Sequence, residues 1–337
     1  MQILIVKTSS LGDVIHTLPA ITDAQQYYPD LQVDWVVEEA FAEIPTWHPA
    51  VKQVIPVALR RWRKQILATY LNGTWYQFKQ VLRSKQYDKI IDAQGLIKSA
   101  FLTYQAIGVR CGLDYHSARE PLSSIAYQQS YNIPKQQHAV TRTRQLFANI
   151  LDYPLPSILP DYGIIKHFQQ QTNNKQPKVV FLHGTTWLTK HWPEANWLKL
   201  AKLVTDAGIK IYIPWGNPIE QQRASKIATV HKNISIIPKS NLYALANILT
   251  QSQAIVGVDT GLAHLAAALS IPSITLYGAT QPALTGTYGN YQHHLSANVK
   301  CSPCFNKKCS ANLICYADLS VEKVWTKLQE LLVNKNS

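Results

Sequence analysis

The stretch from Ala254 to Leu269, AIVGVDTGLAHLAAAL, constrains the fold of this chain more than any other. It opens with a short, apolar run that is rich in β-branched residues, which predicts a buried strand, and it closes with an uncharged helix rich in Ala and Leu. The polar turn Asp259-Thr260-Gly261 separates the two. A buried strand, a tight turn and a buried helix form the repeating unit of a parallel sheet covered by helices on both faces.

The same alternation of strands and helices fills the rest of the chain. Strands are predicted at 2–6, 32–37, 51–57, 89–92 and 109–111, and again at 178–183, 209–214, 234–237, 254–258 and 273–277. Helices are predicted at 14–28, 66–86 and 97–107, and again at 193–207, 219–230, 241–252, 262–269 and 321–333. A polar, Pro-rich linker lies between these groups, from Pro154 to Lys175. The sequence therefore predicts two similar α/β domains, 1–165 and 166–337, and a ligand site in the cleft between them, at the carboxyl ends of the strands.

The charge of the chain favours an anionic partner. Lys and Arg number 33 against 20 Asp and Glu, for a net charge of +13, which suits a nucleic acid, an anionic membrane surface or a polyanionic substrate. No apolar run is long enough to span a membrane or to form a signal peptide, so we expect a cytoplasmic protein. No carboxylate occurs between Glu43 and Asp88, where cations and aromatic residues alternate. Such a stretch can bind nucleic acid, lie on lipid headgroups or form a solvated helix face.

The turn Asp259-Thr260-Gly261 is the first candidate binding site. Because the N–H groups at a helix start have no intrahelical acceptor and the helix dipole is positive there, Thr260 and Gly261 are suited to a phosphate. Asp259 is better suited to sugar hydroxyls than to a phosphate. The alternative is that Asp259 only caps the helix.

Polar side chains also follow four other predicted strands. In the loop from Lys7 to Asp13, the carboxylate is a candidate general base, or alternatively a cap for the helix that starts at Val14. The segment 92–99 lines a cleft or merely forms a turn. Two hydroxyls and a cation near a helix start suit a pyrophosphate, and a carboxylate after a strand can accept the two hydroxyls of a ribose. These last candidates are Thr185, Thr186 and Lys190, and Glu220.

Several blocks of the sequence, taken together, resemble a known family. They are VKTSSLGDVIHTLPA, DAQGLIKSA, SAREP, KHWP and VDTGLAHLAAAL, which follow one another through nearly the whole chain. In this order they are similar to the bacterial lipopolysaccharide heptosyltransferases of glycosyltransferase family 9. The basic run LRRWRK at 59–64, with DAQGLIKSA and SAREP, is closest to the type I members.

The resemblance implies a GT-B fold, with an acceptor-binding N-terminal and an ADP-heptose-binding C-terminal Rossmann-like domain, and a C-terminal helix that packs back on the first. It implies inverting transfer of L-glycero-D-manno-heptose from ADP-heptose to Kdo of Kdo2-lipid A in lipopolysaccharide inner-core biosynthesis. The alternative is a family 9 transferase, such as type II, that uses heptose as acceptor. The implied enzyme needs no cofactor or catalytic metal, and it works as a peripheral protein on the anionic cytoplasmic face of the inner membrane.

The resemblance also implies roles for individual residues. Asp13 would be the base that takes the proton from the acceptor hydroxyl. The donor would be held by Thr185, Thr186, Lys190, Glu220, Asp259, Thr260, Gly261 and His264. The acceptor, whose carboxylates and phosphates need cations, would be held by Ser10, Arg60, Arg61, Arg63, Lys64, Gln94, Lys98 and Arg119.

The cysteines near the C-terminus depart from the type I pattern and look more like type II members. Four of the five cysteines of the chain lie close together, at Cys301, Cys304, Cys309 and Cys315. Their spacing suits a structural zinc ion, while a labile disulfide or free thiols are the alternatives.

A nucleic-acid-binding module is the alternative that charge alone suggests. It leaves Asp13, Lys190 and the Asp259-Thr260-Gly261 turn without a role, and a basic patch is only one of several signs that such a protein shows. We therefore expect no nucleic-acid partner.

Overall fold

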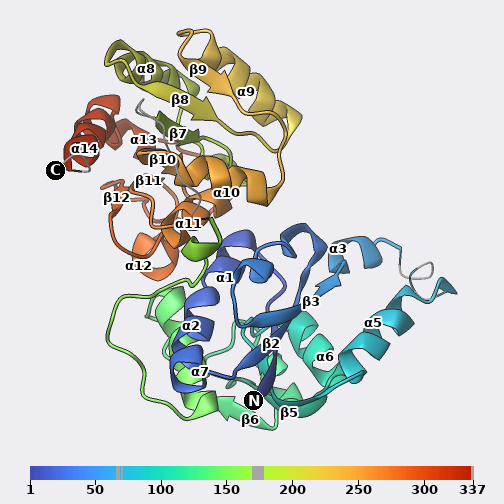
Figure 1. Cartoon of the computed structure of the whole chain (residues 1–337). Helices are drawn as coiled ribbons and strands as arrows, with labels where there is room; N and C mark the ends of the chain where they lie inside the picture. The colour runs from blue at the N-terminus through green and yellow to red at the C-terminus, as the bar shows by residue number, and fades with distance from the viewer. Residues whose placement is uncertain (66–68, 70, 169–177, 335–337) are drawn as a thin grey trace. The chain divides into compact units, whose positions relative to one another are not determined.

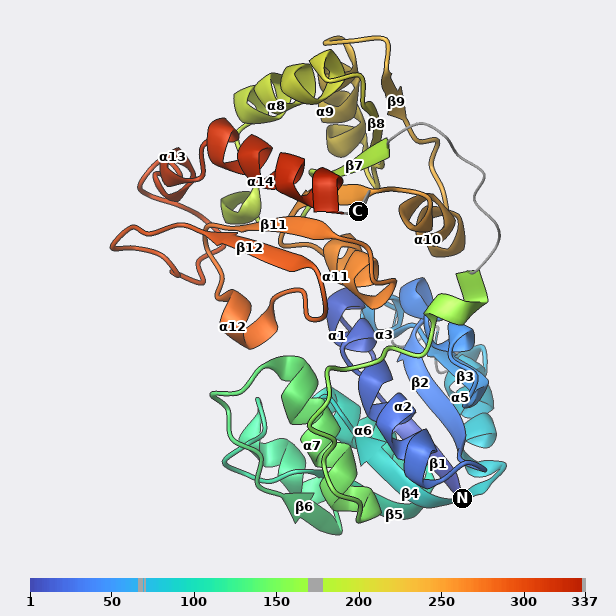
Figure 2. The same ribbon diagram turned by 60° about the vertical axis from the view of Figure 1, so that its left-hand side comes forward.

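The computed structural model describes residues 1–65, 69, 71–168 and 178–334 (Figures 1 and 2). The chain divides into two compact units, Met1–His167 and Phe168–Ser337. The prediction of two α/β halves is confirmed, because each unit contains one six-stranded sheet whose strands are all parallel.

The sheet of the N-terminal unit has the strand order β3-β2-β1-β4-β5-β6. α2 and α7 pack against each other, whereas α6 covers β1, β4 and β5, and α5 lies against β3 and α6. The strands are β1 (Gln2–Val6), β2 (Gln32–Glu38), β3 (Val51–Val57), β4 (Gln86–Asp92), β5 (Ile107–Leu113) and β6 (Gln129–Tyr131). The α-helices are α1 (Leu11–Ile15), α2 (Leu18–Tyr27), α3 (Leu59–Trp62), α5 (Thr74–Arg83), α6 (Ile97–Gln105) and α7 (Ala139–Leu151), and the 3-10 helices are η1 (Glu39–Phe41), η2 (Pro45–Trp47), η3 (Pro121–Ala126) and η4 (Ile165–Phe168).

The sheet of the C-terminal unit has the order β12-β11-β10-β7-β8-β9. α14 packs against α8, β10 and β11, and α11 contacts α10, β10 and β11 (Figure 2). The strands are β7 (Lys178–Leu182), β8 (Lys210–Ile213), β9 (Ile234–Ile236), β10 (Ala254–Val258), β11 (Ser273–Tyr277) and β12 (Gln292–Ser296). The helices are η5 (Leu188–Lys190), α8 (Glu194–Asp206), α9 (Pro218–Ala228), α10 (Leu242–Thr250), α11 (Gly261–Ala268), α12 (Pro282–Thr285), α13 (Cys315–Asp318) and α14 (Val321–Asn334).

The two sheets have the same winding. Counted from the first strand of its own unit, each runs 3-2-1-4-5-6, the order of a doubly wound dinucleotide-binding fold. In each unit the order reverses between the first and fourth strands, β1 and β4 in one and β7 and β10 in the other. At such a switch point the loops leave in opposite directions, which opens a crevice at the carboxyl ends of the strands.

The predicted helix 14–28 is two helices. α1 ends at Ile15 and α2 begins at Leu18, with Pro19 in its first turn, where the missing N–H of a proline costs nothing. The predicted helix 66–86 falls partly outside the described residues; α5 covers Thr74–Arg83, and Gln86 already belongs to β4. The helix α7 and the strands β6 and β12 were not predicted from the sequence.

The closing helix α14 packs on the core of the C-terminal unit. Its apolar side chains Val321, Val324, Leu328 and Leu331 are buried in the core of the C-terminal unit. They cover β10 and β11 beside α8, so the amphipathic face that needed a partner finds it on this sheet.

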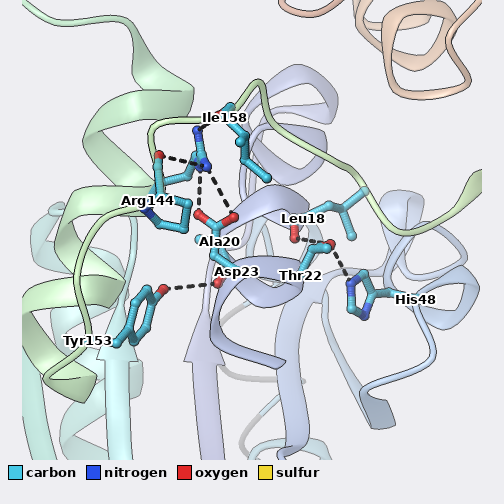
Figure 3. Close-up of polar contacts among 9 residues, drawn as sticks. Leu18, Ala20, Thr22, Asp23, His48, Arg144, Tyr153 and Ile158 are labelled. Carbon is cyan, nitrogen blue, oxygen red and sulfur yellow. Dashed lines mark hydrogen bonds and ion pairs between the residues drawn. The ribbon is translucent and has the colours of Figure 1, made fainter. Parts of the chain in front are cut away.

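A buried ion pair between Arg144 and Asp23 links two helices of the N-terminal unit (Figure 3). Arg144 of α7 donates from Nε to Asp23 Oδ2 at 2.6 Å and from Nη2 to Asp23 Oδ1 at 3.1 Å. The same guanidinium donates to the carbonyl oxygens of Ile158 and Pro156, at 3.1 and 3.2 Å. One side chain thereby joins α2, α7 and the segment that leads out of the unit.

Arg144→Met is expected to lower the free energy of unfolding by about 3–5 kcal/mol, because it leaves the Asp23 carboxylate buried without its partner. Arg61→Met is the matched control in the same unit. It removes an exposed pair with Glu39 at 3.0 Å, which is worth at most about 1 kcal/mol. Urea denaturation of both variants measures the difference, and equal losses would show that the buried pair does not anchor the fold.

Candidate functional site

The Asp259-Thr260-Gly261 turn lies at the switch point of the C-terminal sheet, between the end of β10 and the start of α11. Asp259 is buried, and its Oδ2 accepts from Lys190 Nζ at 2.7 Å and from Thr280 Oγ1 at 2.6 Å. His264 Nε2, one turn into α11, lies 3.7 Å from Asp259 Oδ1. The turn is therefore the centre of a cluster of polar groups from three segments, which contain Lys190, Asp259 with His264, and Thr280.

The surroundings of Asp259 favour its charged form. Burial opposes ionisation, but His264 and Lys190 outweigh this effect and hold the pKa of the carboxyl well below its ordinary value. Lys190 Nζ also lies 4.6 Å from the centre of the Trp187 ring. A carboxylate that stays charged can orient sugar hydroxyls, and the ammonium beside it is available to a phosphate.

The residue that caps α11 is Thr260, not Asp259. Thr260 has extended backbone angles, and its carbonyl accepts the first intrahelical bonds, from Ala263 N and His264 N. The alternative that Asp259 is only a cap is therefore wrong. Gly261 opens the helix, where the first N–H groups point outward without intrahelical acceptors. Thr185 Oγ1, from the end of β7, donates to the Asp259 carbonyl oxygen at 3.2 Å.

Glu220 follows β8, the neighbour of β7, at the same carboxyl edge of the C-terminal sheet as the Asp259 turn. It stands in the first turn of α9, and its Oε2 accepts from Gly216 N at 2.7 Å. A Cβ atom at Gly184 would lie 2.6 Å from Glu220 Cδ, so only glycine lets the carboxylate sit against the β7 loop. Thr186, which was predicted with Thr185, is exposed on this loop.

Two residues of this region, Thr280 and Arg223, were not among the predicted site residues. Thr280 holds the Asp259 carboxylate, but it follows Asp259 by a strand and a loop, so no local motif links them. Arg223 donates from Nη1 to the His183 carbonyl oxygen at 3.2 Å and lies 3.0 Å from His191 Nδ1. Arg223 lies one turn after Glu220 on α9, and residues spaced in this way share a helix face. This spacing could have predicted that Arg223 lies near Glu220.

Asp13 lies at the switch point of the N-terminal sheet, in the first turn of α1. Its Oδ2 accepts from Ser10 N at 2.7 Å and from Ser10 Oγ at 2.8 Å. The helix begins at Leu11 with Ser10 as its cap, so Asp13 does not cap a helix at Val14. Asp13 is partly exposed, and its Oδ1 has no hydrogen-bond partner among the described residues of this unit. That oxygen is available to a substrate proton.

The loop around Asp13 is held by the end of β4. Gln94 Oε1 accepts from both Thr8 N and Thr8 Oγ1 at 2.8 Å, and Lys98 Nζ donates to Ser9 Oγ at 3.3 Å. Asp92 itself is buried and closes a turn, accepting from Gln94 N and Tyr127 OH, and burial raises its pKa. The structure thus brings Ser10, Asp13, Gln94 and Lys98 together as predicted.

Lys7 is a group beside Asp13 that the predicted site lacked. Its Nζ donates to the Ala93 carbonyl oxygen at 2.8 Å. Burial lowers the pKa of this ammonium, while the negative charges of Asp13 and Asp92 act in the opposite direction. The Lys7 ammonium thus lies where its positive charge interacts with the carboxylates of Asp13 and Asp92.

The basic stretch of α3 forms one wall of a groove of about 620 Å³. Arg60, Arg63 and Lys98 line the groove together with the aromatic rings of Trp62, Trp75 and Phe101. Arg61 and Lys64 line a neighbouring cavity of about 360 Å³, and Arg61 Nη2 pairs with Glu39 at 3.0 Å. Arg119 is exposed and the structure does not bring it into this groove. Five of the eight predicted acceptor residues, Arg60, Arg61, Arg63, Lys64 and Lys98, therefore line two adjoining cavities.

For the cysteine cluster near the C-terminus, the sequence leaves a structural zinc ion, a labile disulfide and free thiols open. Cys301, Cys304, Cys309 and Cys315 are free thiols. Among the described residues, no group of three or more His, Cys, Asp or Glu side chains is arranged to hold a metal ion. Cys309 Sγ instead accepts from the backbone N–H groups of Ala311 and Leu313, at 3.3 and 3.4 Å.

No helix in the described ranges is both long and apolar enough to cross a bilayer. Residues 75–315 match the family model of glycosyltransferase family 9 (heptosyltransferase). Over 349 aligned residues, the chain is 49% identical to lipopolysaccharide heptosyltransferase 1 of Pseudomonas aeruginosa, covering 99% of this chain and 98% of that protein.

Two solved structures from E. coli are similar in fold and sequence. The structure of heptosyltransferase WaaC with ADP has a TM-score of 0.90 and 46% sequence identity, covering 98% of this chain and 100% of that one. The structure of WaaC with ADP-2-deoxy-2-fluoro heptose has a TM-score of 0.87 and 45% identity, with 98% and 99% covered. With two parallel, doubly wound sheets, these matches confirm the predicted GT-B fold, and the chain belongs to glycosyltransferase family 9, the heptosyltransferases.

Proposed function

We propose that this protein transfers L-glycero-D-manno-heptose from ADP-heptose to a Kdo residue of Kdo2-lipid A, in the synthesis of the lipopolysaccharide inner core. The observation that carries the proposal is its likeness, over nearly the full length of both chains, to a protein named lipopolysaccharide heptosyltransferase 1. The structures with ADP and with an ADP-heptose analogue support the same donor for this chain.

In the proposed reaction the C-terminal unit holds the donor. The helix start at Thr260 and Gly261, with Lys190 and the hydroxyls of Thr185 and Thr186, binds the diphosphate. Asp259 and His264 orient the heptose hydroxyls, and Glu220 accepts the ribose hydroxyls. When the bond between the anomeric carbon and the phosphate oxygen breaks, its electron pair stays on ADP. Lys190 and the helix N–H groups stabilise that charge without a metal ion.

The N-terminal unit binds and activates the acceptor. Asp13 takes the proton of the acceptor hydroxyl while the oxygen of that hydroxyl bonds to the anomeric carbon, opposite the departing phosphate, so the configuration is inverted. Lys7 places a positive charge near Asp13. Ser10, Gln94 and Lys98 line the approach to the base. The guanidinium and ammonium groups of Arg60, Arg61, Arg63, Lys64 and Arg119 bind the carboxylates of Kdo and the phosphates of lipid A.

A lipid acceptor implies that the enzyme works on the cytoplasmic face of the inner membrane as a peripheral protein. The net charge of +13 supports attraction to an anionic leaflet. Nucleic acid is not among the proposed partners.

The acceptor is tested by incubating the purified protein with ADP-heptose and either Kdo2-lipid A or its monoheptosylated form. We expect addition of one heptose to Kdo2-lipid A, detected by mass spectrometry. Turnover on the monoheptosylated form alone would replace the proposed acceptor with heptose. Omitting ADP-heptose is the control for both reactions.

A further inference from the structure

Helix α6 exposes a stripe of large apolar side chains. Ile97, Phe101 and Tyr104 are 53%, 54% and 59% exposed. Their spacing of four and then three residues places them on one face of the helix. Other side chains of α6, including Leu102, are buried against the sheet. The exposed stripe therefore does not pack in the core of its own unit.

The short helix η3 continues this stripe. Leu122 and Ile125 are 60% and 79% exposed, and because a 3-10 helix has three residues per turn, they lie on the same side. One end of η3 is tied to α6 where Glu120 Oε2 accepts from Ile97 N at 2.7 Å.

The other end of η3 is tied to α6 through Arg110. Its Nε donates to the Ala126 carbonyl oxygen at 2.9 Å, and its guanidinium lies 5.0 Å from the centre of the Tyr104 ring. The two helices therefore lie side by side, and each exposes large apolar side chains. We call this surface the α6–η3 patch, made of Ile97, Phe101, Tyr104, Leu122 and Ile125.

The patch is bordered by cations and adjoins the loop of the proposed base. Lys98 and Arg119 are exposed beside it, and Arg110 bridges its two helices. The carboxylate in the region, Glu120, is engaged by the start of α6. Lys98 Nζ reaches Ser9 Oγ, next to the serine that binds Asp13. A partner that binds the patch is therefore close to the loop of Asp13, where the proposed acceptor binds.

We propose that the α6–η3 patch inserts into the headgroup layer of an anionic phospholipid bilayer. The inference rests on the proposed function, because a lipid-linked acceptor resides in such a bilayer. Aliphatic and aromatic side chains with arginine and lysine at their border match an interface that is apolar below and negatively charged above. Scattered exposed apolar residues need no explanation, but five on two helices in contact concentrate apolar area that water solvates poorly.

The test measures binding to vesicles of phosphatidylethanolamine and phosphatidylglycerol that contain no acceptor, in the absence of sugar nucleotide. Leu122→Ser combined with Ile125→Ser is expected to weaken binding by about tenfold or more, because two apolar side chains no longer enter the interface. The control is Leu159→Ser, which removes a side chain of equal type in the same unit, 55% exposed and outside the patch. It is expected to bind like the wild type.

Activity separates this inference from the proposed function. On a Kdo acceptor freed of its fatty acids, the double variant is expected to turn over at the wild-type rate, whereas on acceptor embedded in vesicles it is slower. A wild type that transfers heptose but does not bind the vesicles would overturn the patch alone. A wild type that binds vesicles through the patch but transfers no heptose would overturn the proposed function alone. Equal binding of variant and control, or a change of oligomeric state with unchanged vesicle binding, would also overturn the patch.

Discussion

Asp13→Asn is expected to lower kcat for heptose transfer by about a hundredfold to ten-thousandfold, the range that a positioned general base contributes. The asparagine oxygen can still accept from Ser10 N and Oγ, so the first turn of α1 is expected to remain formed. What disappears is the negative oxygen that takes the acceptor proton. Steady-state kinetics with ADP-heptose and Kdo2-lipid A measures kcat, and calorimetry with ADP is expected to give an unchanged affinity.

The matched control is Asp88→Asn, in the same unit. Asp88 also accepts a hydrogen bond from a backbone N–H, that of Gln2, at 2.7 Å. It lies within the strand β4, however, and not in the loop that carries Asp13. We expect this variant to keep the wild-type kcat. Near-normal turnover of Asp13→Asn, with the control behaving as expected, would mean that another group or water takes the proton.

The strands of the central sheets were predictable because burial on both faces leaves a simple signature. The strands β1, β10 and β11 begin and end where the sequence predicts, since each is a mainly apolar run that is buried over almost its whole length. β6 and β12 were missed because they lie at sheet edges and carry polar side chains such as Gln129 and His293, which give neither an apolar run nor a strict alternation.

Helix α7 was missed for a different reason. The segment around it is polar, and its buried charge Arg144 interrupts the apolar pattern that would mark a core-facing helix. That arginine is compatible with burial only because Asp23, far away in the sequence, neutralises it. Sequence periodicity cannot register a partner that the fold supplies.

The candidate site was predictable where a residue follows a strand and only partly elsewhere. Asp13 lies in the first turn of α1, Asp259 directly follows β10, and Lys190 lies in the connection between β7 and α8, all places that the parallel-sheet pattern already points to. Thr280 and Lys7 were missed because their roles depend on contacts across loops. The capping alternatives for Asp13 and Asp259 were wrong by a few residues. The cap of α1 is Ser10, three residues before Asp13, and the cap of α11 is Thr260, one residue after Asp259.

Lys190→Gln is expected to reduce kcat/KM by about a hundredfold to a thousandfold, as for removal of a group that stabilises developing charge. In the structure Asp259 already holds the ammonium at 2.7 Å, so little ordering entropy would be lost when it meets the diphosphate of the proposed donor. Lys307→Gln is the matched control. Lys307 Nζ also lies near the Trp187 ring, at 5.5 Å, but it is exposed and makes no pair with Asp259. We expect the control to retain most of the activity.

A stability loss must be separated from a catalytic one, because Lys190→Gln also leaves the buried Asp259 carboxylate with less compensating charge. Combining it with Asp259→Asn removes both charges, and thermal stability is expected to recover while turnover stays low. Lys190 helps to hold the pKa of Asp259 down, so Lys190→Gln is expected to raise that pKa. As the pH is lowered, Asp259 of the variant is then protonated earlier, and the variant is expected to lose its remaining activity at a higher pH than the wild type does. Recovery of turnover in the double variant would show that Lys190 serves only to neutralise Asp259, and that the charge of the departing ADP is stabilised by the helix start alone.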